Sequence, residues 1–97
     1  MGMFILTQKA KDDLLVIGRY TRKRWGKAQQ RHYLTQLDNA FHDLADKPGL
    51  GRACDDIPEG YFKYGVGKHV IFYRHTGKER IQIVRILHGR MDIEQHL

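Results

Sequence analysis

The sequence predicts an α+β domain in which a two-helix antiparallel hairpin packs on one face of a mostly antiparallel four-stranded sheet. Three observations indicate this fold. A short apolar run opens the chain, two stretches with helical spacing of apolar residues follow, and three stretches suited to strands come last. The 97 residues are enough for one domain, spanning 1–97, around a single small core.

The first half of the chain predicts one strand and two helices. The run MFIL at 3–6 is too short for a helix and suits a strand. Thr7 offers an N-cap hydroxyl to a helix that Gly26 ends, and the segment DKPG at 46–49 stops a second helix. The positions expected on the buried helix faces are Ala10, Leu14, Ile17 and Thr21, then Tyr33 or Leu34, Leu37, Phe41 and Leu44.

The second half predicts a loop and three strands. Residues 47–60 hold three glycines and two prolines without periodicity, so they are expected to form a loop. YFKYGVG at 61–67 alternates with a period of two, and HVIFYR at 69–74 follows it. HTGK at 75–78 suits a tight turn. RIQIVRIL at 80–87 is apolar on both faces, which favours a central position in the sheet.

Arg85 interrupts this last apolar strand and therefore needs a partner or a function. If Val84 and Ile86 face the helices, Arg85 projects to the opposite, partly open face together with Lys63 of the neighbouring strand. A structural explanation is an ion pair with a nearby acid. The acids available for it are Glu59 and Glu79.

The net charge of +6 indicates an acidic partner, either nucleic acid or a protein with an acidic segment. Six basic residues and no acid lie within 19–31, which suits a solvated helix face or a docking patch. A simple nucleic-acid-binding module built on this patch would lack repeated exposed aromatics and a groove-reading motif. No apolar run is long enough to span a membrane, so a cytoplasmic protein without membrane contact is expected.

Metal and cofactor sites find little support in the sequence. The six histidines include no helical i, i+4 ligand pair, and the single Cys54 has no companion cysteine. The segment GVG at 65–67 lacks the third glycine and the strand-to-helix context of a dinucleotide loop. We therefore expect no metal and no cofactor.

Metal-free RNA cleavage is a sharper possibility, because it needs only a base for the 2′-hydroxyl, a proton donor to the leaving oxygen and cations around the phosphate. The residues that could supply these groups are Lys63, His69, Tyr73, Arg85 and His88.

Four segments together resemble a known family. They are AKDDLLVIGRYTRKRWG, GRACDDIPEGYFKY, GKHVIFYR and IQIVRILHGRMDIEQHL, in this order over nearly the whole chain. They resemble the ParE-type toxins of the RelE/ParE toxin–antitoxin superfamily, whose fold is also a helix hairpin against an antiparallel sheet. HVIFYR and RILHGRMD are the most specific pieces.

The resemblance implies the toxin of a type II toxin–antitoxin system that inhibits DNA gyrase and so DNA replication, rather than an enzyme. The alternative within the superfamily is a RelE-like, ribosome-dependent messenger-RNA endoribonuclease. Such nucleases tend to use a tyrosine near the C-terminus, whereas no tyrosine follows Tyr73 here. The ending HGRMDIEQHL matches the ParE branch, although His88 would remain available as an acid or a base.

The resemblance also implies partners. A ParD-like antitoxin would neutralise the toxin in a hetero-oligomeric complex, and operator DNA would be contacted only through that antitoxin. Its acidic, flexible segment would fold on the toxin and bury apolar surface there. We expect it at the free edge of the first strand and at three exposed residues of the helix hairpin, Leu15, Tyr20 and Trp25.

The last predicted strand delivers polar residues to the rim of the sheet, where a large target could be engaged without chemistry. The residues predicted to bind the target are Lys63, Lys68, Arg85, His88, Arg90 and Met91. A structural alternative is a salt link from Arg90 or Arg85 to Asp92 or Glu94 that only fastens the C-terminal segment.

Overall fold

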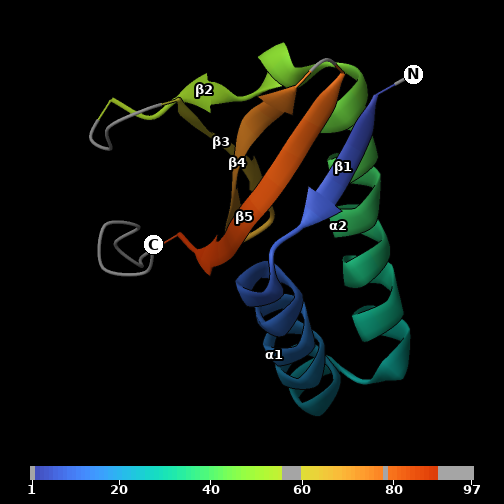
Figure 1. Cartoon of the computed structure of the whole chain (residues 1–97). Coiled ribbons are helices and arrows are strands. Elements are labelled where there is room, and N and C mark those ends of the chain that lie inside the picture. The colour runs from blue at the N-terminus through green and yellow to red at the C-terminus, as the bar shows by residue number, and fades with distance from the viewer. Residues whose placement is uncertain (1, 56–59, 78, 90–97) are drawn as a thin grey trace.

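A computed structural model describes residues 2–55, 60–77 and 79–89. Both helices pack against one face of a single sheet (Figure 1). The elements in chain order are β1 (Met3–Leu6), α1 (Gln8–Trp25), α2 (Lys27–Asp46), the 3-10 helix η1 (Pro48–Leu50), β2 (Arg52–Ala53), β3 (Tyr61–Val66), β4 (His69–Gly77) and β5 (Arg80–His88).

The sheet has five strands in the order β1-β5-β4-β3-β2, so the predicted count of four strands is wrong by one. β1 runs parallel to β5, and the other neighbouring pairs are antiparallel. The additional strand, β2, lies in the predicted loop 47–60, which also contains η1. With only two residues, β2 has no alternation that a pattern could detect. β5 lies between β1 and β4, which confirms the predicted central position.

The helix hairpin follows the sequence prediction. The Thr7 hydroxyl accepts a hydrogen bond from the Ala10 N–H at 3.0 Å and so caps α1. Gly26, at φ 95°, separates the two helices in a conformation that favours glycine. The predicted faces are confirmed, with Leu14, Tyr33 and Leu34 only partly buried. The helix residues in the core cluster are Ala10, Ile17, Leu37, Ala40, Phe41, Leu44 and Ala45.

A β-bulge in β5 alters the predicted faces of that strand. Phe72 pairs with Arg85 and Tyr73 pairs with Ile83, which leaves Val84 without a partner. Ile83 and Ile86 both belong to the core cluster as a result, whereas Val84 does not. The prediction that Val84 faces the helices is therefore wrong, because one extra residue shifts the alternation of side chains.

Side chains of α1 and its N-cap form hydrogen bonds with the edge of β5 beyond the point where β1 ends. β1 pairs with β5 only as far as Ile83. Beyond that point the Thr7 hydroxyl donates to the Val84 carbonyl at 2.7 Å, and the Asp13 carboxylate accepts the Ile86 N–H at 2.9 Å. Backbone groups that would otherwise lie at an open edge are thus satisfied by side chains of the helix and its cap.

The hydrogen bonds that join Asp13 to β5 should contribute to the stability of the fold. Asp13→Ala should lower the free energy of unfolding by about 2 to 3 kcal/mol, because it removes charge-assisted hydrogen bonds from a largely buried position. The neighbouring Asp12→Ala, which loses only an exposed contact to Gln8, should change it by less than about 0.5 kcal/mol. Chemical denaturation of both variants measures the difference, and equal losses would contradict the role assigned to Asp13.

Candidate functional site

Polar side chains gather at the end of the sheet where β4 begins and β5 ends. His69 and His88 are register partners, and their rings meet edge to face with centroids 5.8 Å apart. From α2, the Tyr33 hydroxyl lies 2.6 Å from Nδ1 of His69 and 3.0 Å from the Val66 carbonyl oxygen. Two strands and one helix therefore contribute to one polar cluster between the layers.

The contacts of Tyr33 favour one tautomer of His69. The Val66 carbonyl can only accept, so the single hydroxyl hydrogen of Tyr33 is donated there. Both short contacts are satisfied only when His69 carries its hydrogen on Nδ1 and donates it to the Tyr33 oxygen. In that tautomer the other ring nitrogen, Nε2, carries a lone pair.

The surroundings of His69 favour its neutral form. Burial lowers the pKa of His69, the nearby His88 lowers it further, and Asp13 raises it by a smaller amount. Burial likewise raises the pKa of the Tyr33 hydroxyl, although backbone hydrogen bonds partly offset this. Tyr33 and His69 are therefore both uncharged at neutral pH.

Gly67 allows the Tyr33 ring to reach this cluster. The residue has φ 56°, and a Cβ atom built on it would lie 2.8 Å from the Tyr33 ring. Such a contact is too short for any larger residue without displacement of the tyrosine. The glycine at the turn between β3 and β4 thus serves both the backbone conformation and the packing.

Arg85 is held by α1. Its guanidinium donates two hydrogen bonds of 2.8 Å to the Asp13 carboxylate, and both side chains are only 14% exposed. These hydrogen bonds raise the pKa of Arg85. An ion pair at Arg85 is thus present, but Glu79 is not its acid, and Glu59 lies outside the described residues. The acid comes from a residue 72 positions away in the sequence, which spacing could not reveal.

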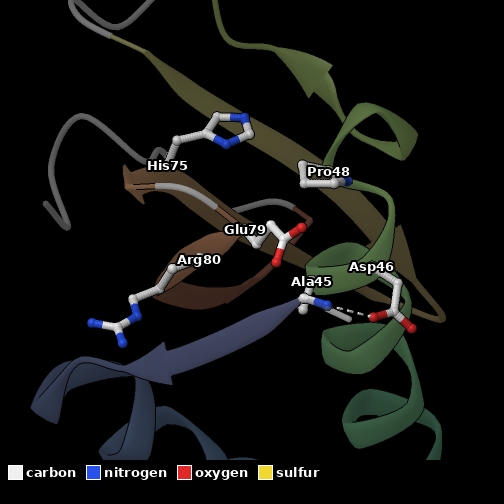
Figure 2. Close-up of a pocket in the computed structure, with 7 residues that line it drawn as sticks. Ala45, Asp46, Pro48, His75, Glu79 and Arg80 are labelled. Atoms are coloured by element: carbon white, nitrogen blue, oxygen red, sulfur yellow. Dashed lines mark hydrogen bonds between the residues drawn. The ribbon is translucent and has the colours of Figure 1, made fainter.

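A cavity of about 540 Å³ lies at the opposite end of the sheet, near the end of α2 (Figure 2). Figure 2 shows Arg80 pointing away from both Glu79 and Asp46, and the Asp46 carboxylate accepts the Gly2 N–H at 3.0 Å. Within residues 2–55, 60–77 and 79–89, no group of three or more potential ligands could hold a metal ion. No helix in the same residues is long and apolar enough to cross a membrane.

Comparison with known proteins decides the family. The family model for the ParE toxin of the type II toxin–antitoxin system parDE matches residues 4–93. This chain belongs to the ParE toxin family. Toxin ParE1 of Mycobacterium tuberculosis is 43% identical over 94 residues, covering 97% of this chain and 96% of that protein. Toxin ParE1 of Caulobacter vibrioides is 36% identical, covering 100% of this chain and 99% of that protein. Toxin ParE of Escherichia coli is 34% identical, covering 100% of this chain and 94% of that protein.

Solved structures confirm the ParE-like fold. A chain of the chromosomal ParDE toxin–antitoxin system from P. aeruginosa superimposes with a TM-score of 0.75 and 21% identity, covering 91% of this chain and 95% of that one. A chain of the toxin–antitoxin complex RelBE2 from Mycobacterium tuberculosis superimposes with a TM-score of 0.66 and 21% identity, and the match covers 90% of this chain and 96% of that one. This chain thus shares its fold with chains of the two systems named ParDE and RelBE2.

The residues predicted to bind the target of a ParE toxin do not form one continuous group in the structure. Lys68 is exposed in the turn after β3, where its carbonyl accepts the Gly89 N–H at 2.9 Å, close to the half-buried His88. Lys63 is exposed on β3 and shares a row across the sheet with Phe72 and Arg85. Two further residues of that prediction, Arg90 and Met91, lie outside the described residues, as do Asp92 and Glu94.

The three residues predicted to bind the antitoxin are all exposed, at 58% for Leu15, 61% for Tyr20 and 63% for Trp25. Leu15 and Tyr20 nevertheless point in directions about 140° apart, because each helical residue advances about 100° around the axis. Val16, 63% exposed, lies one turn from Tyr20 on the same side of α1 and was missed. The i, i+4 spacing of Val16 and Tyr20 was the signal that could have found it.

The lowered pKa of His69 makes stability depend on pH. As pH falls through about 6.5, the unfolded chain binds a proton at this histidine while the folded chain does not. The free energy of unfolding should therefore decrease toward lower pH, by at most about 1.4 kcal/mol per pH unit from this group. Denaturation between about pH 7.5 and about pH 5.5 should show a shallower dependence in His69→Gln.

His32→Gln is the matched control, because His32 is exposed on α2. It should keep the pH dependence of the unaltered protein. A His69→Gln variant with an unchanged slope would show that His69 is not protected from protonation in the folded state.

Proposed function

We propose that this ParE-family chain inhibits DNA gyrase and thereby blocks DNA replication. Membership of the ParE toxin family, established over residues 4–93, is the observation that carries the proposal. The arrangement of the polar groups supports it by arguing against the alternative of RNA cleavage.

Metal-free RNA cleavage needs a base, an acid and cations within reach of one phosphate. Tyr73 is fully buried, and its hydroxyl donates to the Pro48 carbonyl at 2.6 Å and accepts the Gly51 N–H at 3.0 Å. These contacts argue against a part for Tyr73 in cleavage, because its hydroxyl belongs to the core.

The remaining groups of the nuclease hypothesis lie on different faces of the sheet. His69 contacts Tyr33 of α2, so His69 and its register partner His88 belong to the helix side. Lys63 alternates with Phe62 and Tyr64, which pack against the core, so Lys63 points to the other face. Lys63 and the two histidines therefore face opposite sides of the sheet. The separation supports a toxin that binds its target rather than one that cleaves RNA.

Lys68 and His88 form the rim surface through which we expect gyrase to be engaged. The double variant Lys68→Ala/His88→Ala should fold and lose at least about tenfold in inhibition, since removal of one central interface residue can weaken binding by about 2 kcal/mol or more. The matched control is Lys47→Ala/His42→Ala, which removes an exposed lysine and an exposed histidine of α2 and its end. Circular dichroism verifies that both double variants remain folded.

The readout combines two assays on the same preparation. Purified gyrase with ATP and plasmid DNA should accumulate broken DNA, while messenger RNA on programmed ribosomes should remain intact. Cleaved RNA together with unaffected gyrase would contradict the proposal and support the ribonuclease hypothesis. Equal inhibition of gyrase by the rim variant and its control would show that Lys68 and His88 do not contribute, and would leave gyrase as the target.

We further infer a ParD-like antitoxin whose acidic segment folds on α1, in a hetero-oligomer that contacts operator DNA only through the antitoxin. The exposed apolar side chains of α1 and the basic charge of this chain support it. The similar structures are chains of systems described as ParDE and RelBE2. Because Leu15 and Tyr20 lie on different sides of α1, a segment that contacts both must pass around the helix.

Single alanine variants at Leu15, Tyr20 and Trp25 should each weaken antitoxin binding by about tenfold, as expected for partly exposed apolar anchors. Leu50→Ala provides the control, since Leu50 is 46% exposed in η1 rather than on α1. Isothermal titration of each variant with the antitoxin measures the change. Full affinity for an antitoxin without its C-terminal half would contradict the assignment.

A further inference from the structure

One face of the sheet carries an unusual concentration of positive charge. The cationic face is defined by Arg52 of β2, Lys63 of β3 and Arg74 of β4, all exposed and on the side away from the helices. Their direction follows from their neighbours, since Phe62 and Tyr73 pack in the core on the opposite side. Arg52 and Lys63 are register partners on adjacent strands, about 4.8 Å apart, and Arg74 lies two residues along β4 from Phe72, the partner of Lys63.

No negative charge balances this face within the strands. Among the strand residues that the structure describes there is no Asp or Glu. Within the described part of the chain, the one ion pair of a strand cation joins Arg85 of β5 to Asp13 of α1. In the described ranges, no ion pair joins Arg52, Lys63 or Arg74. These cations therefore remain available to an external anion.

The placement of two of these cations opposes folding. Arg52 and Lys63 are direct cross-strand partners in an antiparallel pair. Like charges directly opposite each other destabilise such a pair. Nothing in the packing of β2 against β3 requires this combination, because both side chains are exposed. An anion bound between them would remove the repulsion.

The third cation is held in position. The Nε of Arg74 donates to the Gln82 side chain at 2.9 Å, and the guanidinium lies over the Tyr61 ring, 5.7 Å from its centroid. These contacts leave the terminal nitrogens of the guanidinium free to donate to a phosphate oxygen. Ordering this side chain before binding reduces the entropy lost when a ligand is bound.

The surroundings of the cationic face favour a phosphodiester backbone over an acidic peptide. A folding peptide needs apolar anchors, but Phe72, which lies in the same row as Lys63, is only 6% exposed. The exposed apolar residues of the sheet, Met3 and Ile5, are on β1, which β5 separates from the cations. A nucleic-acid backbone needs only positive charge and hydrogen-bond donors.

We propose that the cationic face binds the phosphodiester backbone of duplex DNA, so that the toxin contacts the DNA held by its target as well as the target itself. The choice of DNA over RNA rests on the proposed inhibition of gyrase. The contact is independent of base sequence, because it involves phosphates alone. It lies on the face of the sheet opposite to the Tyr33–His69–His88 cluster.

The test compares two triple variants of equal charge change. Arg52→Gln/Lys63→Gln/Arg74→Gln removes the cationic face, and Arg19→Gln/Lys23→Gln/Lys27→Gln removes the same charge from the exposed surface of the helix hairpin. Fluorescence anisotropy with a labelled DNA duplex, and with an RNA duplex of the same sequence, measures binding between about 50 and 200 mM salt. A cleavage assay with gyrase runs in parallel.

The sheet variant should bind DNA at least about tenfold more weakly, and the slope of log affinity against log salt should become shallower by about 2 to 3, because three phosphate contacts are lost. The helix variant should bind like the unaltered toxin. Unchanged DNA binding of the sheet variant, equal weakening of both variants, or tighter binding of RNA would each overturn the proposal.

The parallel assay separates this proposal from gyrase inhibition. Weaker DNA binding together with reduced accumulation of broken DNA supports both. Full inhibition of gyrase by a sheet variant that no longer binds DNA would overturn the DNA contact and leave gyrase inhibition intact. An unaltered toxin that binds DNA through this face but does not affect gyrase would contradict the proposed function alone.

Discussion

The carboxylate of Asp13 connects the two layers of the domain. It accepts the N–H of Ile86 and two hydrogen bonds from Arg85, at the point where β5 has lost its neighbour β1. Without this carboxylate, the end of β5 would present an open edge and a cation with little exposure. The position of α1, and with it the exposed apolar surface proposed for the antitoxin, depends on this contact. So does the rim, because His88 lies only two residues beyond Ile86.

The sheet separates two kinds of polar surface. On the helix side, burial and the neighbouring His88 lower the pKa of His69, whose Nδ1 contacts the hydroxyl of Tyr33. On the other side, Arg52, Lys63 and Arg74 remain charged and exposed. This division argues against a nuclease built on Lys63, His69 and His88, since Lys63 and the two histidines lie on opposite faces of the sheet. It is compatible with a toxin that acts by binding, with separate surfaces for the antitoxin, the target and the DNA.

Much of the fold could be predicted because it depends on local signals. The Thr7 cap, the break at Gly26 and the helix faces follow from interactions between residues close together in the chain. The bulge at Val84 could not be predicted, because it arises from pairing with β4. The assignment of Lys68 and His88 to target binding stays a prediction, and the structure shows only that they lie near each other. Tyr33 carried no signal beyond a place on an amphipathic helix.

The sequence by itself determined the helix hairpin, the order of the elements other than η1 and β2, the positive charge and the resemblance to ParE toxins, since these depend on composition and on short-range spacing. Only the tertiary structure decided which acid pairs with Arg85, which residues lower the pKa of His69, and that three exposed cations of the described strands share one face. Each of these depends on groups brought together from distant parts of the chain. Such contacts are set by strand register and by helix packing, neither of which is encoded in the spacing of any single motif.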